Sequence, residues 1–233
     1  MKKLTVKILK YLHKIINYRR EYFEEDGERV FIDFHKMEYS KLDMYQKSHL
    51  KRYQFATTKV KPFDNLGDFA CGTGYGTVLL ASFTRSVVGV DINSKIVTAI
   101  SKKYINIANV SFLNSNLLDL SFKNKFEKII SFETIEHLEE ESIIPLFKIF
   151  NDALKDDGLL IFSVPYMQEP CKAALELGHH KTFSIDITKA TLWLDSTNFK
   201  LQEVYYQNYL THEVLITQNK KDFLICVAQK IKT

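Results

Sequence analysis

The sequence predicts an α/β fold built on a doubly wound, mostly parallel sheet, and three observations predict it. From residue 66 onward, short apolar runs alternate with helix-length segments, which is the pattern of βαβ units. A glycine-rich loop at 72–76 follows the first run, and an acid, Asp91, ends the second. The last two apolar runs have no helix between them, so we expect them to pair as antiparallel strands.

The expected elements follow from these runs. Strands are expected at 67–70, 86–91, 110–113, 127–132, 159–165, 199–207 and 222–230. Helices are expected at 41–60, 75–83, 93–105, 141–154 and 186–196. Gly158 follows the helix at 141–154 closely and is expected to cap it. We therefore divide the chain into an N-terminal helical extension or cap, 1–60, and a sheet domain, 61–233.

Composition is that of an ordinary globular protein. The chain has 233 residues, 45% of them apolar and 26% charged. Its three cysteines, Cys71, Cys171 and Cys226, are far apart and odd in number, so they predict neither a disulfide framework nor a zinc site. Cysteines without a disulfide framework are typical of a protein in a reducing compartment. We therefore expect a cytoplasmic protein, and we expect no membrane-spanning segment.

The N-terminal 20 residues differ in charge from the rest. They carry seven lysines and arginines and no acid, so the formal net charge of +4 becomes −3 once they are set aside. Because the rest of the chain is mildly acidic, we expect no nucleic-acid partner. Residues 1–20 read as an amphipathic basic helix. Such a helix could pack on its own domain, on a sister subunit in a homodimer, or weakly on a membrane surface.

The glycine loop allows three ligand readings. A Walker A loop needs a lysine after the glycines, and none is present. In a dinucleotide fingerprint the third glycine would stand at Thr77, but here it comes one residue early, at Gly76. S-adenosylmethionine (SAM) has no phosphate and carries an ammonium and a sulfonium, so an acid at the loop mouth, Asp68, suits it. Asp68 is expected to accept from the ammonium, directly or through water.

Asp91 supports the SAM reading. It ends the second strand, where a carboxylate can accept from both ribose hydroxyls. The alternative is that the loop is only a tight turn and Asp91 only an N-cap for the helix near Ser94.

The motifs together resemble the class I SAM-dependent methyltransferases, over roughly residues 45–230. "GDFACGTGYG" is similar to motif I, "VVGVDIN" to motif II and "KFEKIISFETIEHL" to motif IV. The resemblance implies a Rossmann-like seven-stranded sheet of order 3-2-1-4-5-7-6 with strand 7 antiparallel, and an adenine contact at Asn116. The cofactor site is then expected to comprise Arg52, Tyr53, Asp68, Ala70, Cys71, Gly72, Thr73, Gly74, Tyr75, Asp91, Ile92, Asn116, Leu117, Phe132 and Glu133.

Candidate catalytic groups follow the fourth strand. "FETIEH" places Glu133, Glu136 and His137 at i, i+3 and i+4, which is one face of a helix, and His180 lies in a later loop. His137 and His180 could act as bases without a metal. Alternatively, all four residues could hold a divalent ion such as Mg²⁺, as in the metal-using O-methyltransferases that this segment resembles.

A second resemblance concerns the segment "HLKRYQFA", residues 49–56. Together with "ACGTGYG" and "HHKTF" it is similar to bacterial methyltransferases linked to surface-polysaccharide synthesis, within the type 11 and type 23 groups. On a helix, His49, Arg52 and Tyr53 would share a face and could cover the cofactor as a lid. Arg52 would then meet the methionine carboxylate, and Tyr53 would cover the sulfonium. The alternative is a helix packed on the sheet edge, with Arg52 in solvent.

The predicted function is O-methylation of a small polar acceptor, such as a sugar or a nucleotide-linked glycan precursor. Three alternatives stay open: RNA 2′-O-methylation, small-molecule N-methylation and a non-catalytic SAM-binding partner subunit. Nothing in the sequence identifies the acceptor. Five aromatic residues are candidate walls for it: Tyr166, Trp193, Tyr205, Tyr206 and Tyr209.

Overall fold

The computed structural model describes residues 29–33, 38–170 and 179–232. The predicted basic helix at 1–20, most of the extension before residue 38, and Cys171 lie outside these ranges. No helix within the described ranges is both long enough and apolar enough to cross a membrane.

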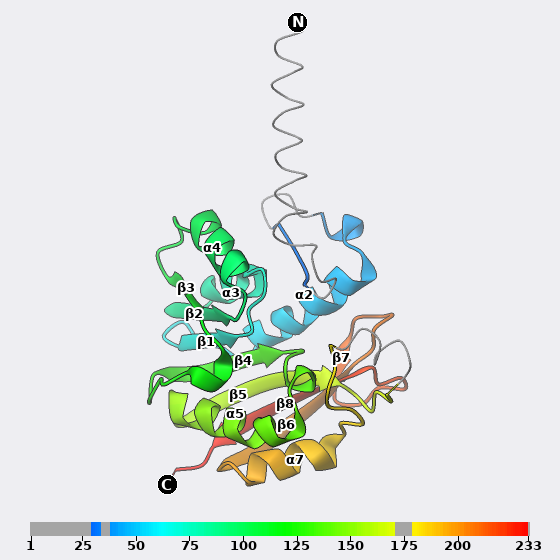
Figure 1. The fold of residues 1–233 in the computed structure, drawn as a ribbon. Coiled ribbons are helices and arrows are strands. Elements are labelled where there is room, and N and C mark those ends of the chain that lie inside the picture. The colour runs from blue at the N-terminus through cyan, green and yellow to red at the C-terminus, as the bar shows by residue number, and fades with distance from the viewer. Residues whose placement is uncertain (1–28, 34–37, 171–178, 233) are drawn as a thin grey trace, which may run out of the picture.

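A twisted sheet forms the centre of the molecule, with strand order β3-β2-β1-β4-β5-β8-β6-β7 (Figure 1). Its strands are β1 Asn65–Phe69, β2 Ser86–Asp91, β3 Val110–Asn114, β4 Phe126–Phe132, β5 Leu154–Pro165, β6 Phe199–Gln207, β7 Val214–Leu215 and β8 Phe223–Lys230. The first five pair in parallel, and β8 is antiparallel to both β5 and β6. This confirms the predicted Rossmann-like order. The two-residue edge strand β7 is an addition, so the last long strand is β8.

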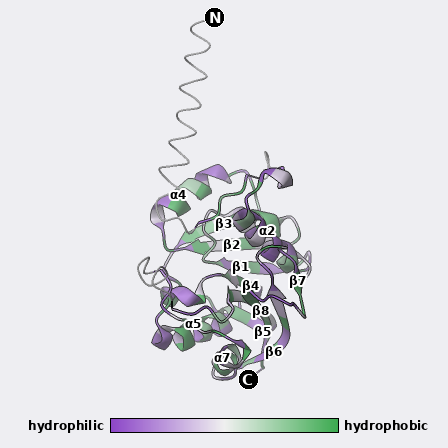
Figure 2. Ribbon diagram, turned by 90° about the vertical axis from the view of Figure 1, so that its right-hand side faces the viewer, coloured by the Kyte–Doolittle hydropathy of each residue, from purple (hydrophilic) through white to green (hydrophobic). Residues whose placement is uncertain are grey.

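Helices cover both faces of the sheet (Figure 1). The helices are α2 Met44–Thr57, α3 Tyr75–Ala81, α4 Ser94–Lys103, α5 Glu140–Ala153 and α7 Ile187–Asp195, with short 3-10 turns at Tyr39–Lys41, Leu117–Asp119 and Ile135–His137. Helices α5 and α7 bury Phe147, Phe150 and Trp193 in one core, whereas α2 and α3 bury Leu50 and Leu80 in another. Apolar colour accordingly gathers on the central strands (Figure 2).

The predicted helix cap at Gly158 is wrong. Helix α5 ends at Ala153 and β5 begins at the next residue, so Gly158 lies inside a strand. A Cβ on Gly158 would stand 2.8 Å from the carbonyl oxygen of Lys155. The glycine therefore relieves crowding in the first part of β5, where the β4–β5 pairing shifts register.

Helix α2 is built into the sheet domain. Asp43 caps its N-terminus, because its side chain accepts from the Gln46 amide while the Gln46 side chain accepts from the Asp43 amide. Leu50, Tyr53 and Ala56 then pack in the same core as β1 and α3. Helix α2 and the sheet therefore share one core. The division of the chain at residue 60 stays a prediction.

Candidate active site

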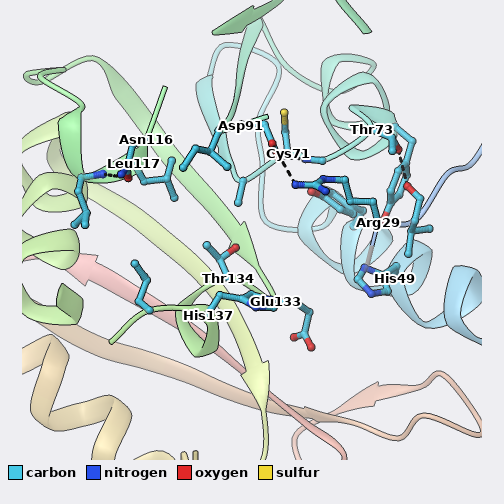
Figure 3. A pocket seen from close by; sticks show the side chains of 18 residues that line it. Arg29, His49, Cys71, Thr73, Asp91, Asn116, Leu117, Glu133, Thr134 and His137 are labelled. Carbon is cyan, nitrogen blue, oxygen red and sulfur yellow. Dashed lines mark hydrogen bonds and ion pairs between the residues drawn. The ribbon is translucent and has the colours of Figure 1, made fainter. Parts of the chain in front are cut away.

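A cavity of about 390 Å³ opens where β1, β2 and β4 end, at their carboxyl edge. Ligands of doubly wound sheets bind at this edge. Predicted cofactor residues on its wall are Tyr53, Ala70, Cys71, Gly72, Thr73, Tyr75, Asp91, Ile92, Asn116, Leu117 and Glu133. Figure 3 shows Asp91 and Cys71 on one side of the cavity, with Glu133, Thr134 and His137 on the other.

The three loop glycines serve three different purposes. Gly72 has a left-handed φ of 52°, and a Cβ there would meet nothing within 4 Å, so it leaves the wall open. Gly74 also has a left-handed φ, 72°, and a Cβ there would press on Phe112 at 2.9 Å. Gly76 admits the Tyr53 ring, which would lie 2.1 Å from an added Cβ. Of the three, Gly72 alone lines the cavity.

Asp91 already organises the loop. Its Oδ2 accepts from the Gly72 amide at 2.9 Å, and its Oδ1 accepts from the Asn93 amide at 2.9 Å. The Arg29 guanidinium lies 3.9 Å from Oδ1 (Figure 3). The carboxylate therefore lies at the cavity wall in a fixed orientation, as a contact to ribose hydroxyls requires.

Asp68 lies behind the wall. It is fully buried, accepts from Tyr53 Oη at 3.0 Å and from Thr77 Oγ1 at 2.6 Å, and does not line the cavity. Burial raises the pKa of Asp68 to about 6, against the opposing effect of the two hydroxyl donors. Asp68 thus orients Tyr53, which does line the cavity, and its contact with an ammonium, directly or through water, stays a prediction.

Arg52 also differs from the prediction. Its side chain is fully buried, with Nη1 donating to Gln207 Oε1 at 2.7 Å and the guanidinium 4.4 Å from the centre of the Phe223 ring. It does not line the cavity, whereas His49 and Tyr53 do. Because successive helical residues point about 100° apart, Arg52 reaches β6 and β8 while Tyr53 faces the loop. Arg52 thus anchors the helix instead of meeting a cofactor carboxylate.

Asn116 supplies a polar side chain at the predicted adenine end of the site. Its Oδ1 accepts from the Leu118 amide at 3.0 Å, as the cap of the short turn Leu117–Asp119. Ile92 and Leu117 supply apolar surface nearby on the same wall. Phe132 and Gly74, predicted as contacts, do not line the cavity, since Phe132 is buried in the core shared with α2 and α3 and Gly74 is the N-cap of α3.

A segment that sequence reasoning missed crosses the cavity. Arg29 and Val30 line it, and the Val30 carbonyl accepts from Thr73 Oγ1 at 2.5 Å. The Phe31 carbonyl accepts from Gln46 Nε2 at 2.8 Å, which ties the segment to α2. In the sequence, Val30, Phe31 and Ile32 form a short apolar run between Arg29 and Asp33, and that run was the available signal. Other wall residues missed are Leu118, Thr134 and Leu138, whereas His49 lines the cavity from the helix face predicted to cover the cofactor.

A second cavity of about 480 Å³ adjoins the first and shares His49, Glu133 and His137 with it. Its other wall residues are Tyr45, Glu136, Pro165, Tyr166, Gln168, His180, Tyr209, Lys221, Asp222 and Phe223. Two of the five predicted aromatic wall residues are among them, Tyr166 and Tyr209. The other three are engaged elsewhere, since Trp193 and Tyr206 lie in the core and Tyr205 hydrogen-bonds to Glu203.

Glu133 is not on the helical face predicted for it. It has a left-handed φ of 51° and precedes the 3-10 turn Ile135–His137, so the i, i+3, i+4 argument does not apply. Its Oε1 accepts from Ser163 Oγ at 2.6 Å. Such a conformation is costly for a non-glycine residue and is commonly kept at functional sites.

The other three predicted metal ligands do meet. Candidate ligand atoms of Glu136, His137 and His180 all lie within 4.8 Å of one another. His137 Nδ1 lies 2.8 Å from the His179 carbonyl oxygen, and His180 Nδ1 lies 2.7 Å from Gln168 Oε1. Burial, with His137 and His179 nearby, lowers the pKa of His180 to about 4. A neutral imidazole of this kind can accept a proton or bind a cation.

Comparison with known proteins identifies the fold. Residues 67–158 match the family model described as a methyltransferase domain. The structure of the N-methyltransferase NodS from Bradyrhizobium japonicum WM9, bound to S-adenosyl-L-homocysteine, superposes with a TM-score of 0.66 at 15% identity, covering 92% of this chain and 96% of NodS. The fold is that of the class I SAM-dependent methyltransferases. The [4+2]-cyclase SpnF has the same methyltransferase fold, with a TM-score of 0.64 at 13% identity and coverage of 83% and 86%.

Curated relatives match a shorter part of the methyltransferase fold. A protein of Geobacillus sp. (strain WCH70), named as a "putative methyltransferase", is 30% identical over 47% of this chain and 48% of its own. A Mycobacterium tuberculosis (strain H37Rv) protein, named as a "probable S-adenosylmethionine-dependent methyltransferase", is 27% identical over 60% and 47%. The chain thus spans about half the length of the curated relatives it matches.

Proposed function

We propose that this chain is a SAM-dependent methyltransferase whose first cavity holds SAM and whose second cavity holds the methyl acceptor. The observation that carries the proposal is the common wall, because methyl transfer needs the two reactants to meet in line at one point. The family-model match and the SAH-bound structural neighbour support the cofactor.

In this proposal Asp91 accepts from the ribose hydroxyls, and the Gly72 backbone lies against the cofactor without a side chain between them. Ile92, Asn116 and Leu117 flank the adenine. Tyr53, oriented by Asp68, faces the sulfonium, which favours the electron-rich face of an aromatic ring.

The proposed binding of SAM to the first cavity can be tested by thermal denaturation. SAM at about one hundred times its Kd should stabilise the wild type by about 2.7 kcal/mol. For a chain of this size that corresponds to a rise in Tm of roughly 5–10 °C. Asp91→Ala should lose most of the rise, whereas Asp119→Ala, an exposed acid outside the wall, should keep it. An equal rise in both variants would refute the assignment of Asp91.

For the acceptor, we propose a small polar molecule methylated on oxygen, such as a sugar or nucleotide-linked sugar. The second cavity supports this class, since it combines aromatic walls at Tyr45, Tyr166 and Tyr209 with hydrogen-bonding groups at Gln168 and Asp222. A panel of nucleotide sugars incubated with SAM, with release of S-adenosylhomocysteine as the readout, tests it directly.

N-methylation is the second candidate. Two carboxylates, Glu133 and Glu136, lie on the wall of the second cavity, where they could hold an amine. NodS, an N-methyltransferase, shares the fold. Amino sugars belong in the same panel, and turnover of these alone would favour nitrogen as the acceptor atom.

A divalent ion, if used, would be held by Glu136, His137 and His180. One carboxylate with two imidazoles suits Mn²⁺, Fe²⁺ or Zn²⁺ better than Mg²⁺, which prefers oxygen ligands. A bound ion would lower the pKa of an acceptor hydroxyl. The surface-polysaccharide subtype, the homodimer and a membrane-surface role for residues 1–20 stay predictions.

A further inference from the structure

His49 stands where the two cavities meet. Among the residues that the structure describes, three line both cavities: His49 from α2, Glu133 from the end of β4, and His137 from the following turn. A methyl group that passes between occupants of the two cavities must pass between these side chains. Figure 3 shows His49 on the α2 side of the pocket, across from His137.

The three shared residues differ in how far their polar atoms are engaged. Glu133 Oε1 accepts from Ser163, and His137 Nδ1 is held at the His179 carbonyl. Across residues 29–33, 38–170 and 179–232, no hydrogen bond engages either ring nitrogen of His49. The imidazole is half-buried, so its nitrogens are available to a ligand in the cavity.

The ring is also held in place and uncharged. The Tyr45 ring meets it edge-on at 4.5 Å between centroids, and the helix beneath it is fixed by its N-terminal cap and by the Arg52–Gln207 hydrogen bond. Burial, and then the nearby Arg52 charge, lower the pKa of His49 well below its ordinary value. The imidazole is therefore neutral at its fixed position before transfer, which leaves the lone pair of one ring nitrogen open to a proton.

We propose that His49 contacts the methyl acceptor and takes its proton during transfer. The inference rests on the proposed function. A lone pair of the acceptor oxygen forms the new bond to the methyl carbon, and the carbon–sulfur bond breaks with its electron pair passing to sulfur. The acceptor proton passes to a ring nitrogen of His49, so the positive charge lost by the sulfonium reappears on the imidazolium. His137 then belongs to the cluster with Glu136 and His180.

The first test needs no acceptor. The full chain, labelled at its histidine rings, is saturated with SAM carrying a ¹³C methyl group, and through-space contacts from that methyl are recorded by NMR. His49→Gln identifies the His49 signals, and His212→Gln identifies a buried histidine outside both cavities. A contact from the methyl to the His49 ring and none to His212 is expected. If SAM saturates the protein and its methyl group shows no through-space contact to the His49 ring, the inference is overturned.

The second test uses any acceptor that turns over. His49→Gln should lower kcat by about 100-fold or more while SAM affinity stays within about twofold, and added imidazole should restore part of the activity of His49→Ala. Turnover by His49→Gln at the wild-type rate also overturns the inference. Where no acceptor in the panel reacts, the NMR result decides alone. Failure of SAM to bind the wild type contradicts the proposed function itself, so the two failures are distinguishable.

Discussion

Gly76→Ala should destabilise the protein through Tyr53. An added Cβ would stand 2.1 Å from the Cε1 and Cζ atoms of the Tyr53 ring, so the ring must move. Overpacking of this kind costs about 1–3 kcal/mol. Moving the ring also breaks the 3.0 Å hydrogen bond from Tyr53 to Asp68, which contributes about 1.5–3 kcal/mol when the acceptor is charged. The substitution gains about 1 kcal/mol of helix propensity, because Gly76 lies inside α3.

The expected net loss is about 1.5–5 kcal/mol in the free energy of unfolding, measured by urea denaturation. A double-mutant cycle isolates the cause, because Gly76→Ala should be neutral or slightly stabilising when Tyr53 is already alanine. Gly72→Ala is the matched control. Its Cβ meets nothing within 4 Å, so its backbone cost at a φ of 52° should be independent of Tyr53. Additive losses for Gly76→Ala and Tyr53→Ala would refute the reasoning.

Three further predictions concern groups around the cavities. Because burial raises the pKa of Asp68 to about 6, its ionisation opposes folding. The free energy of unfolding, measured in urea, should therefore fall as the pH rises from about 4 to about 6. This fall should be smaller in Asp68→Asn. Arg52→Ala should destabilise by about 2–4 kcal/mol yet keep SAM affinity within about threefold by calorimetry, since Arg52 bonds to Gln207. Hundredfold weaker SAM binding would instead restore a cofactor role for Arg52. Glu136→Gln should weaken Mn²⁺ or Zn²⁺ uptake by calorimetry, and unchanged uptake would argue against a metal at that cluster.

The sheet could be predicted closely because local patterns determine it. Apolar runs bounded by polar turns located β2 and β6 to the residue, and Asp91 was placed correctly because parallel strands end at one edge. The edge strand β7 carries only two residues, Val214 and Leu215, which is too short for a periodic signal.

The site was harder to predict, because it depends on backbone conformation and on contacts distant in sequence. Glu133 departs from the helical face through a left-handed φ that its residue type does not signal. Arg52 was assigned to the cofactor from its motif, but its partner Gln207 lies 155 positions away. Arg29 reaches the cavity only because its segment folds back over the loop.

The common wall of the two cavities has a stereochemical consequence. If SAM and acceptor occupy adjoining cavities at once, the methyl carbon undergoes a single displacement and the protein never carries the methyl group. A methyl group made chiral with hydrogen, deuterium and tritium should therefore emerge with inverted configuration. Transfer through a methylated side chain on the wall would take two displacements and preserve the configuration. The handedness of one product carbon thus reports whether the two cavities act together.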